Sequence, residues 1–461
     1  MDEKIMNELI SDAFDRNLNR NAQMNRFFDY HRGDHDILKT LAGTGKPNNK
    51  LVFNFAELII ATNHSYLFSK PQSYDYKYRQ ESWIKKLFSK DKVETLTDEF
   101  LQDVKVIYFD NNEEGTTSKL GKKAAIAGEA VELHYIDTEG NIRFTETDAR
   151  DWVFFTYENE DFAARRLKRE EYRQEGQSIE KVEVEYVEVY TKETITEYEL
   201  TEQGYKKINE QQHFYGEIPV IRFFNGDKIE GKDTVSDLKN VVALNDAYNL
   251  ANSSSLNNLN YNGDPYLITK NFTFDDEQVE NFKDTRIIEI LGDDASIDFL
   301  QWNQETKGYE SFLDRVERDL FILSFTPDLF SKEGLSSDSG VSLKMKFIGA
   351  DLKADAKIRS FITGFRKRLK LIARQLENKT NKSYFTDGIY RNVDITFNKN
   401  LPQNLKETVE MVNLLAGSVS EETRMKLLPF VDNAKEELER MNKEQGLSTS
   451  TLFGDDPNER V

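Results

Sequence analysis

Apolar residues in the first quarter of the chain recur every three or four positions. Residues 1 to about 40 form a polar stretch of this kind, and the stretch from Phe53 to Phe68 has its apolar residues on one side before Lys70-Pro71 ends it. Residues 81–109 show the same spacing twice. This periodicity predicts a series of helices, because about 3.6 residues make one helical turn.

The pattern changes to alternation in the second quarter of the chain. The run Ala130–Ile136, followed by turn-forming residues, predicts a strand and a tight turn. Further on, Val182–Tyr186 alternates strictly and Val187–Tyr190 resumes one residue out of phase. Such a shift is typical of a β-bulge or of a strand buried on both faces. We therefore expect a β-rich region over about 127–226.

Helical spacing returns at Asp233 and predicts a helix over 233–262. Its second half, 252–260, consists largely of Asn and Ser, which are mediocre helix formers, so we expect something other than helix propensity to account for them. A small insert is predicted over 263–303, with strands and one short helix. A second amphipathic helix is predicted over 304–326.

A polar loop follows the second helix. The segment Ser331–Gly340 contains four Ser, two Gly and one apolar residue, so it cannot bury much surface and we expect it to be mobile. A long helix is predicted over about 342–378, and a strand near 393–397.

The last part of the chain is predicted to be helical over 401–445. Ser418–Glu421 matches the capping-box pattern that begins many helices. The remaining residues, 446–461, have the composition of a flexible tail.

Acidic residues outnumber basic ones. The 461 residues include 82 Asp and Glu against 62 Lys and Arg, a net charge of −20. A protein that grips nucleic acid over its whole surface is normally basic, since phosphate contacts supply the affinity. The composition therefore argues against a DNA-binding module, but not against a wall past which DNA slides.

The chain contains no cysteine, which excludes disulfides and thiol catalysis and suits a reducing cytoplasm. Met1–Lys4 is polar and begins no signal peptide, and the longest apolar runs are far shorter than the ~20 residues of a membrane span. We expect a soluble α+β protein with two to four structural regions.

The long helix carries the one charge anomaly. Ser342–Lys379 contains eleven basic and three acidic residues. Either these cations pair with acidic residues of the same or a neighbouring subunit, or some of them line a DNA path. The candidates are Lys344, Lys346, Lys353, Lys357, Arg366, Lys367 and Arg368.

Familiar catalytic and metal-binding motifs do not occur in the sequence. Gly43–Lys46 differs from a phosphate-binding loop, because Thr40 and Pro47 occupy positions where that motif needs Gly and Ser or Thr. His31 and His35 have metal-ligand spacing, but the glycine between them predicts a turn. We therefore predict no catalytic residue, no metal and no cofactor.

Several blocks of sequence are distinctive when taken in order. They are Tyr30–Ile37, Lys46–Lys50 and Phe68–Pro71; Ile218–Val220, Asn225, Gly231–Leu238 and Leu244–Asn249; and Ser339–Lys344 before the long helix. Together they cover about 30–400. In this order they resemble the portal, or head-to-tail connector, proteins of tailed bacteriophages, most closely the siphophage type from Gram-positive hosts.

The resemblance implies a ring, usually of twelve subunits, at one capsid vertex, with regions called wing, stem, clip and crown. In this sequence they would be wing 1–232, with its β-rich part at 127–226; first stem helix 233–262; clip 263–303; second stem helix 304–326; tunnel loop 327–341; wing helix and strand 342–400; crown 401–445; and tail 446–461. The neutral Asn and Ser side chains of the first stem helix would give DNA a weakly repelling wall.

The implied function is a channel for packaging, retaining and ejecting double-stranded DNA without sequence preference, in the virion and, during assembly, in the host cytoplasm. The implied partners are the packaging terminase, the head-completion adaptor, and the scaffolding and major capsid proteins. The expected docking positions on the clip are Asp276, Glu277 and Glu280, and the expected channel collar is Ser331, Lys332, Glu333, Gly334, Leu335, Ser336, Ser337, Asp338, Ser339 and Gly340.

Two other functions stay open at this point. One is another structural or adaptor protein of the virion, and the other is a DNA-processing enzyme of the packaging machinery. The enzyme would need a metal cluster or a phosphate loop.

Overall fold

The structure, a computed structural model, describes residues 3–41, 47–76, 90–175, 178–227, 235–262, 266–271, 273, 294, 296–300, 306–329, 345–400, 405–428, 430–431, 434 and 437–444. The chain divides into two compact units. The larger comprises Met1–Gly334 and Phe347–Lys399, and the smaller comprises Leu335–Lys346 and Asn400–Val461.

A series of helices opens the larger unit, as predicted. They are α1 (Glu3–Arg16), α2 (Leu18–Arg32), the 3-10 turn η1 (Asp36–Lys39), α3 (Phe55–Phe68), α4 (Lys90–Asp110) and α5 (Glu113–Ala127). Gly33 ends α2 with a left-handed φ of 90°, which favours glycine. The predicted turn between His31 and His35 is therefore confirmed.

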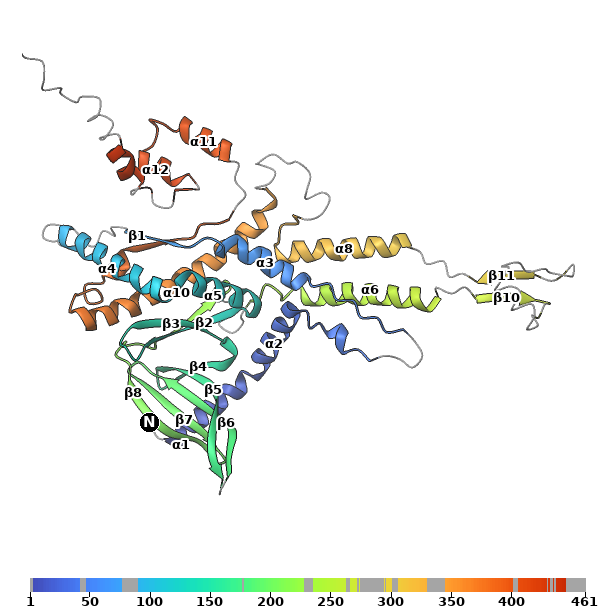
Figure 1. Ribbon diagram of the computed structural model, residues 1–461, viewed down its shortest axis with the longest axis horizontal. Coiled ribbons are helices and arrows are strands. Elements are labelled where there is room, and N and C mark those ends of the chain that lie inside the picture. Colours follow the sequence, from blue (N-terminus) through green and yellow to red (C-terminus); the bar gives the residue numbers. More distant parts are fainter. Residues whose placement is uncertain are drawn as a thin grey trace, which may run out of the picture. The chain divides into compact units, whose positions relative to one another are not determined.

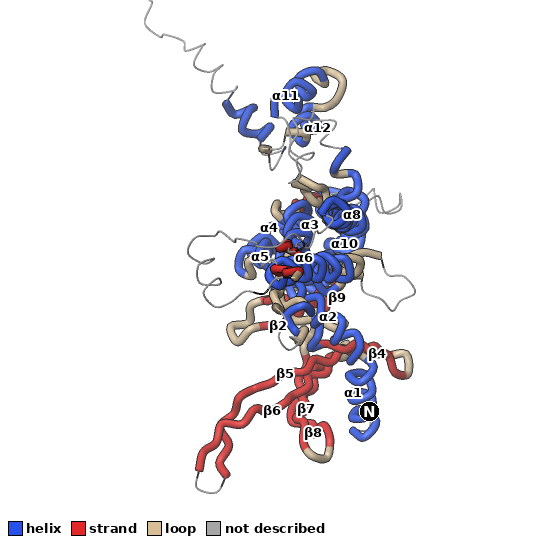
Figure 2. The backbone as a smooth tube through the Cα atoms, turned by 90° about the vertical axis from the view of Figure 1, so that its right-hand side faces the viewer, coloured by secondary structure: helices blue, strands red, loops and turns tan. Residues whose placement is uncertain are grey.

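The β-rich region is also confirmed. Its strands are β2 (Glu129–Ile136), β3 (Ile142–Thr147), β4 (Trp152–Tyr157), β5 (Glu160–Glu175), β6 (Ser178–Tyr190), β7 (Thr194–Thr201), β8 (Gly204–Gln212) and β9 (Val220–Phe224). They form a three-stranded sheet in the order β3-β2-β9 and a five-stranded sheet in the order β4-β5-β6-β7-β8. Figure 2 shows the β5–β6 hairpin extending beyond the neighbouring strands, because β7 pairs only with the last part of β6, Tyr186–Tyr190.

The phase shift in β6 comes from burial on both faces. β6 pairs with β5 without a register shift, and the consecutive residues Tyr186 and Val187 are both buried. Of the two alternatives, a bulge in β6 is therefore wrong. A register shift does occur nearby in the pairing of β7 with β8, where Glu197 faces Asn209 and Tyr198 faces Lys207.

Two helices lie side by side after the sheets (Figure 1). They are α6 (Val242–Asn262) and α8 (Thr306–Ser324), and between them in sequence β10 (Tyr266–Lys270) pairs antiparallel with β11 (Ser296–Leu300). α6 begins later than the predicted Asp233. Turns precede it, in which Ser236 Oγ accepts the Leu238 amide at 3.0 Å.

The long helix α10 (Ile348–Thr380) organises the core of the larger unit. Its apolar stripe, which includes Phe361, Phe365 and Leu369, is buried as predicted. Phe223 of β9 packs against both phenylalanines, with ring centroids 5.1 and 5.4 Å away. The turn η4 (Ile389–Asn392) follows, and β12 (Val393–Thr396) pairs with β1 (Ser73–Tyr76).

The smaller unit contains α11 (Leu405–Leu414) and α12 (Glu421–Lys426). Ser420 is the cap of α12, since its Oγ accepts the Thr423 amide at 3.3 Å. The predicted cap, Ser418, instead donates its amide to Leu415 in the preceding turn. The predicted capping box is thus wrong by two residues.

We predict that Gly364→Ala destabilises the protein by about 1–3 kcal/mol, the usual cost of overpacking a core. A Cβ at Gly364 would lie 2.3 Å from Phe223 Cε1, and this ring is fully buried. Urea unfolding measures the effect. The matched control is Gly308→Ala in α8, where a Cβ meets nothing within 4 Å. If the two variants proved equally stable, the close packing at Gly364 would be refuted.

Candidate functional site

Polar side chains of α6 hold an extended segment of the same chain. Asn249, Ser253 and Asn257 lie one helical turn apart, and each accepts a backbone N–H from the segment 49–53. The N···O distances are 2.9 Å from Phe53 to Asn249, 2.9 Å from Leu51 to Ser253 and 2.6 Å from Asn49 to Asn257. The spacings match, because four helical residues advance about 6 Å and two extended residues about 6.6 Å.

One further bond joins α6 to this segment, and another holds the Asn249 side chain in place. Asn245 Nδ2 donates to the Phe53 carbonyl at 2.8 Å, and Asn249 Nδ2 lies 2.8 Å from Nδ1 of the buried His35. We call Asn245, Asn249, Ser253 and Asn257 the α6 ladder. The ladder confirms that something other than helix propensity accounts for polar residues of this helix: their side chains form hydrogen bonds to another segment of the chain. For Ser253 and Asn257 it corrects the expectation of a channel wall, because their oxygens bind their own chain.

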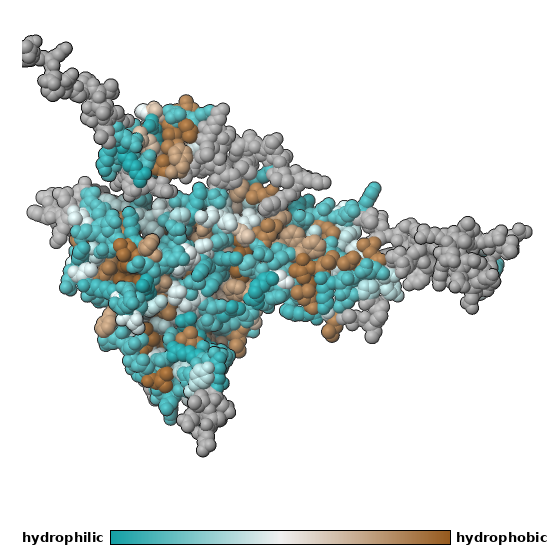
Figure 3. Space-filling model, viewed as in Figure 1, coloured by the Kyte–Doolittle hydropathy of each residue, from teal (hydrophilic) through white to brown (hydrophobic). Residues whose placement is uncertain are grey.

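The rest of α6 is electrically neutral. Asp246 is the one charged residue in the helix, and it pairs with Arg26 at 3.2 Å and accepts a hydrogen bond from Tyr30. Leu250 and Leu259 are 57% and 59% exposed, so the solvent side of the helix mixes apolar side chains with neutral polar ones such as Ser254. Figure 3 shows apolar residues gathered on the surface over α6 and α8.

α8 packs against α6 through apolar residues. Val316 and Leu320 of α8 share a buried cluster with Val242, and Tyr248 packs against it. At the end of α8, Ile322 is 60% exposed, which leaves a second apolar position without cover within one subunit. The helix pair therefore combines a buried seam with a few exposed apolar side chains, while α8 also exposes charged residues such as Glu310, Asp314 and Arg318.

Several of the predicted basic residues of α10 are bound inside the chain. Lys353 and Lys357 both contact the buried Asp237, at 3.0 and 2.6 Å. Lys367 Nζ donates to the Val220 carbonyl at 2.9 Å. Arg368 is fully buried.

Of the two roles left open for these cations, pairing with acidic residues of the same subunit is therefore confirmed for Lys353, Lys357 and Arg368. Lys357 and Arg368 are 3% and 0% exposed, so neither reaches DNA or a neighbouring subunit. Their partners were not identified from sequence. The prediction stays open for the exposed Arg366 and for Lys346, while Lys344 lies outside the described residues.

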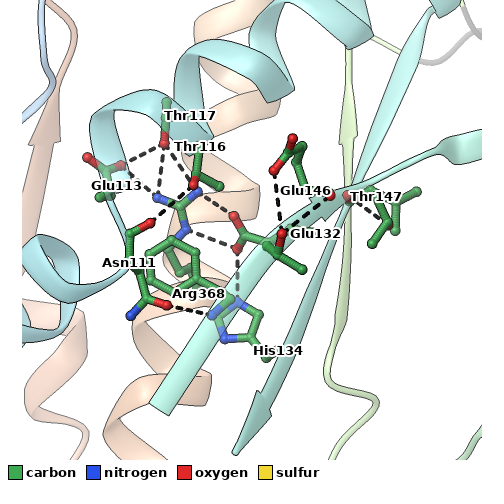
Figure 4. A network of polar contacts seen from close by, with 12 residues as sticks. Asn111, Glu113, Thr116, Thr117, Glu132, His134, Glu146, Thr147 and Arg368 are labelled. Atoms are coloured by element: carbon green, nitrogen blue, oxygen red, sulfur yellow. Dashed lines mark hydrogen bonds and ion pairs between the residues drawn. The ribbon is translucent and has the colours of Figure 1, made fainter. Parts of the chain in front are cut away.

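Arg368 connects three elements through buried carboxylates (Figure 4). It bonds both oxygens of Glu132 on β2, at 3.0 and 2.5 Å, and Glu113 on α5 at 2.7 Å. Thr117 donates to Glu113 at 2.7 Å, and His134 Nε2 lies 2.8 Å from Glu132. A bidentate guanidinium–carboxylate pair of this kind fixes distance and orientation together.

The network controls the ionisation of Glu132. Burial raises its pKa, but the charge of Arg368 and the hydrogen bonds of His134 and Arg368 outweigh this and hold the pKa at about 2. The pKa of His134 is lowered, because burial penalises its charged form more than Glu132 favours it. Glu132 is thus a carboxylate at neutral pH, balanced by the guanidinium.

The remaining predictions concern metal ligands, membrane spans, the channel collar and the docking positions. Within the described ranges, no cluster of three or more potential metal ligands occurs, and no helix is long and apolar enough to cross a membrane. His35 is buried against Tyr30, with ring centroids 4.5 Å apart. The predicted collar, Ser331–Gly340, and the docking positions Asp276, Glu277 and Glu280 lie outside the described residues.

Comparison with known proteins identifies the class to which this architecture belongs. A family model described as phage portal protein, SPP1 Gp6-like, matches residues 10–449. The portal protein of Bacillus phage SPP1 is 26% identical over 234 residues, which are 50% of this chain and 45% of that protein. The portal protein of Clostridium phage phiCD119 is 23% identical over 444 residues, 89% of this chain and 88% of that protein.

These matches define a class of structural proteins of bacteriophages. The chain belongs to the SPP1 Gp6-like family of phage portal proteins. The resemblance found in the sequence is therefore confirmed. The match to the SPP1 relative spans less than half of that protein's length.

We predict that Ser253→Ala destabilises the protein by about 1–2 kcal/mol, because the Leu51 amide loses its acceptor. Ser254→Ala is the matched control. It makes the same chemical change one residue away, at an exposed position, where alanine gains a few tenths of a kcal/mol in helix propensity. Thermal or urea unfolding distinguishes the two. Equal stabilities would show that the ladder bond contributes nothing.

We also predict that Arg368→Met costs about 3–5 kcal/mol at pH 7, because two buried carboxylates lose their cation. The control is Arg366→Met on the exposed side of α10, with an expected change within about 0.5 kcal/mol. Urea unfolding of both variants measures the difference. A small effect at Arg368 would contradict the buried network.

Acidification should reduce the difference in free energy of unfolding between the wild-type protein and Arg368→Met. In the wild type, the pKa of Glu132 is about 2, below its ordinary 4.5, so the stability it contributes is lost as pH falls from 4.5 toward 2. Without Arg368, burial raises this pKa above 4.5, so protonation relieves the buried charge. Urea unfolding of both proteins from pH 7 to pH 4 tests this prediction. A difference in unfolding free energy that stays constant or grows as the pH falls would contradict it.

Proposed function

We propose that this chain is the subunit of a closed ring at one capsid vertex, through which double-stranded DNA is packaged, retained and ejected. The observation that carries the proposal is the family match over residues 10–449. The neutral α6 supports it, because a channel for a polyanion needs a wall with few fixed cations.

The regional assignment is part of the proposal. The stem is α6 with α8, and the clip lies between them at 263–303. The tunnel loop is 327–341, the wing comprises 1–232 and 342–400, and the crown is 401–445. The division of the chain near residue 400 supports a separate crown, because the smaller unit contains α11 and α12.

The ring is proposed to contain twelve subunits and to join through the outer sides of the stem helices. Leu250, Leu259 and Ile322 support this, since these large apolar side chains are more than half exposed in one subunit. A neighbouring copy that covers them would remove apolar surface from water.

The proposed partners are the packaging terminase and head-completion adaptor at the clip, and the scaffolding and major capsid proteins elsewhere on the subunit. Assembly is proposed to take place in the host cytoplasm, before the ring becomes part of the virion. The subunit itself is proposed to catalyse no reaction; the packaging motor would supply the energy for DNA movement.

We predict that Leu250→Gln weakens ring formation, with a loss of about 1–2 kcal/mol of apolar burial at each interface. Leu18→Gln is the matched control, because Leu18 is 61% exposed on α2 and Leu250 is 57% exposed on α6. Native mass spectrometry and electron microscopy give the ring fraction, and circular dichroism checks folding. Normal rings from Leu250→Gln would exclude this interface, and monomers from the wild type at all concentrations would exclude the ring.

Replacing Glu333–Ser339 with a short glycine linker should leave ring assembly intact and shorten the packaged genome or cause its loss. The reason is that this polar loop has little surface to contribute to assembly but is proposed to contact DNA. Rings are counted by electron microscopy, and packaged DNA is sized by pulsed-field electrophoresis. Normal packaging would remove the loop from the mechanism, and failed assembly would make it a structural element.

A triple substitution that removes charges from the proposed clip is the contrasting variant to the loop replacement. Asp276→Asn, Glu277→Gln and Glu280→Gln together leave the loop unchanged and alter only the proposed docking surface. They should weaken binding of the terminase or adaptor to purified rings. Unchanged binding of both partners would exclude this docking surface.

A further inference from the structure

Large apolar side chains are exposed where α8 ends and α10 begins. They are Ile322 and Leu323 in the last turn of α8, Phe325 directly after it, and Ile348 and Leu352 at the start of α10. Each is between 47% and 64% exposed. A Cβ at Gly349 would lie 3.6 Å from Cδ1 of Phe325, so this ring lies against the first turn of α10 and joins the two helix ends. We call the five exposed residues the junction patch.

Phe325 holds a backbone conformation that its residue type disfavours. Its φ is 58°, in the left-handed region. The Thr326 amide donates to the Phe321 carbonyl at 3.0 Å, a bond that closes helices whose next residue is left-handed. Glycine usually occupies this position, as Gly33 does at the end of α2. A bulky residue there strains the backbone, and such strain is concentrated at binding and switching positions.

The part of the junction patch on α8 faces away from α6. Val316 and Leu320 share the buried cluster between the two helices, so they mark the side of α8 that contacts α6. Ile322 follows Leu320 by two residues and therefore lies about 200° further round the helix. The helix pair thus presents the junction patch on its α8 side.

A second exposed surface lies on the opposite side of the helix pair. Tyr248 of α6 packs against the cluster shared with α8, and Leu250 lies about 200° round the helix from it. Ala243 and Ser254, seven residues before and four residues after Leu250, share its face, and all three side chains are exposed. We call Ala243, Leu250 and Ser254 the α6 outer face.

These two surfaces meet the requirement of a closed ring. A ring of more than two subunits repeats one head-to-tail contact, in which each subunit uses two different surfaces. The junction patch and the α6 outer face lie on opposite sides of the same helix pair, and neither contains a charged residue. A contact between them would bury apolar surface without removing an ion from water.

We propose that Phe325 anchors each subunit to the next, its ring and the rest of the junction patch packing on the α6 outer face of a second copy of this chain. The inference rests on the proposed ring and specifies which surfaces of neighbouring subunits meet. Burial of the aromatic ring in this contact would offset the strained backbone at Phe325. The proposed tunnel loop lies between Phe325 and Ile348 in the sequence, so each neighbour would hold both ends of the loop.

Cysteine crosslinking tests which surfaces meet, because the chain has no cysteine of its own. Ile322→Cys is combined in turn with Ala243→Cys, Leu250→Cys and Ser254→Cys, three positions that allow for a shift along the helix. After oxidation, at least one pair should give a ladder of covalent oligomers on a denaturing gel. Ile322→Cys with Leu18→Cys on α2 is the control and should stay monomeric on the gel. So should Ile322→Cys alone, because a head-to-tail contact does not bring two copies of one residue together.

Phe325→Asn tests the anchor, and Phe214→Asn is the matched control. Phe214, between β8 and β9, is likewise left-handed, with a φ of 57°, and is 66% exposed. Asparagine tolerates this conformation, so both substitutions should leave the isolated subunit at least as stable as the wild type. Only Phe325→Asn should weaken assembly, raising the subunit concentration at half assembly at least about tenfold. Native mass spectrometry gives the ring fraction, and thermal unfolding of dilute subunits gives the melting temperature.

The outcomes separate this contact from the ring itself. If wild-type rings form but none of the three cysteine pairs crosslinks, or if Phe325→Asn assembles as well as Phe214→Asn, the contact is wrong and the ring stands. Covalent dimers from Ile322→Cys alone would show a two-fold contact and also overturn it. A lower melting temperature of Phe325→Asn with normal assembly would show that the chain's own smaller unit covers the patch. Wild-type protein that stays monomeric at all concentrations would refute the ring and this contact together. The crosslinking leaves Phe325 unchanged, so it decides the question even if Phe325→Asn fails to fold.

Discussion

A guanidinium without access to solvent determines how the larger unit is assembled. Arg368 has to keep its acidic partners, because the alternative is an uncompensated charge in a low-dielectric interior. Those partners lie on α5 and on β2, the central strand of the sheet β3-β2-β9. The network therefore holds α10, α5 and β2 in one arrangement. Phe365 and Phe144 cover the guanidinium at 4.7 and 4.8 Å, and their rings keep water from the network.

The stem helix α6 depends on a different principle. It has few charges and only modest helix propensity, so its position comes from side-chain bonds to the segment 49–53 and from packing on α8. This solution keeps one side of the helix free of ionic groups. A helix anchored by salt bridges would instead have presented cations or anions to whatever passes alongside it.

The sequence was sufficient for features that repeat along the chain. The apolar stripe of α10 and the alternation in the β-rich region each predicted an element that the structure contains. The four-residue spacing of the ladder was also visible, and it would have indicated a polar contact. What that contact binds was not visible, since Asn257 and Asn49 are 208 residues apart. Likewise, periodicity cannot distinguish an exposed cation from a buried one.

The sequence left open whether the basic residues of α10 pair with acidic residues or line a DNA path, and it did not identify their partners. Arg368 and Glu132 are 236 residues apart, and Lys357 and Asp237 are 120 apart, so only the fold brings them together. Local patterns were misread in two places. Ser420, and not Ser418, caps α12. Ser418 belongs to the turn after α11, where its amide donates to the Leu415 carbonyl. α6 begins at Val242, and Asp237 lies in the turns before it, where it pairs with Lys353 and Lys357 of α10.

The projecting β5–β6 hairpin has a consequence for solubility. A two-stranded ribbon leaves both of its edges open, and open edges invite strands from other molecules to add to them. Here the ribbon carries cross-strand ion pairs, Lys168 with Glu183 and Lys181 with Glu170, each at 2.6 Å. An approaching strand would have to desolvate these charges. The ribbon is thus protected against amyloid-like aggregation, even where many copies are concentrated in one place.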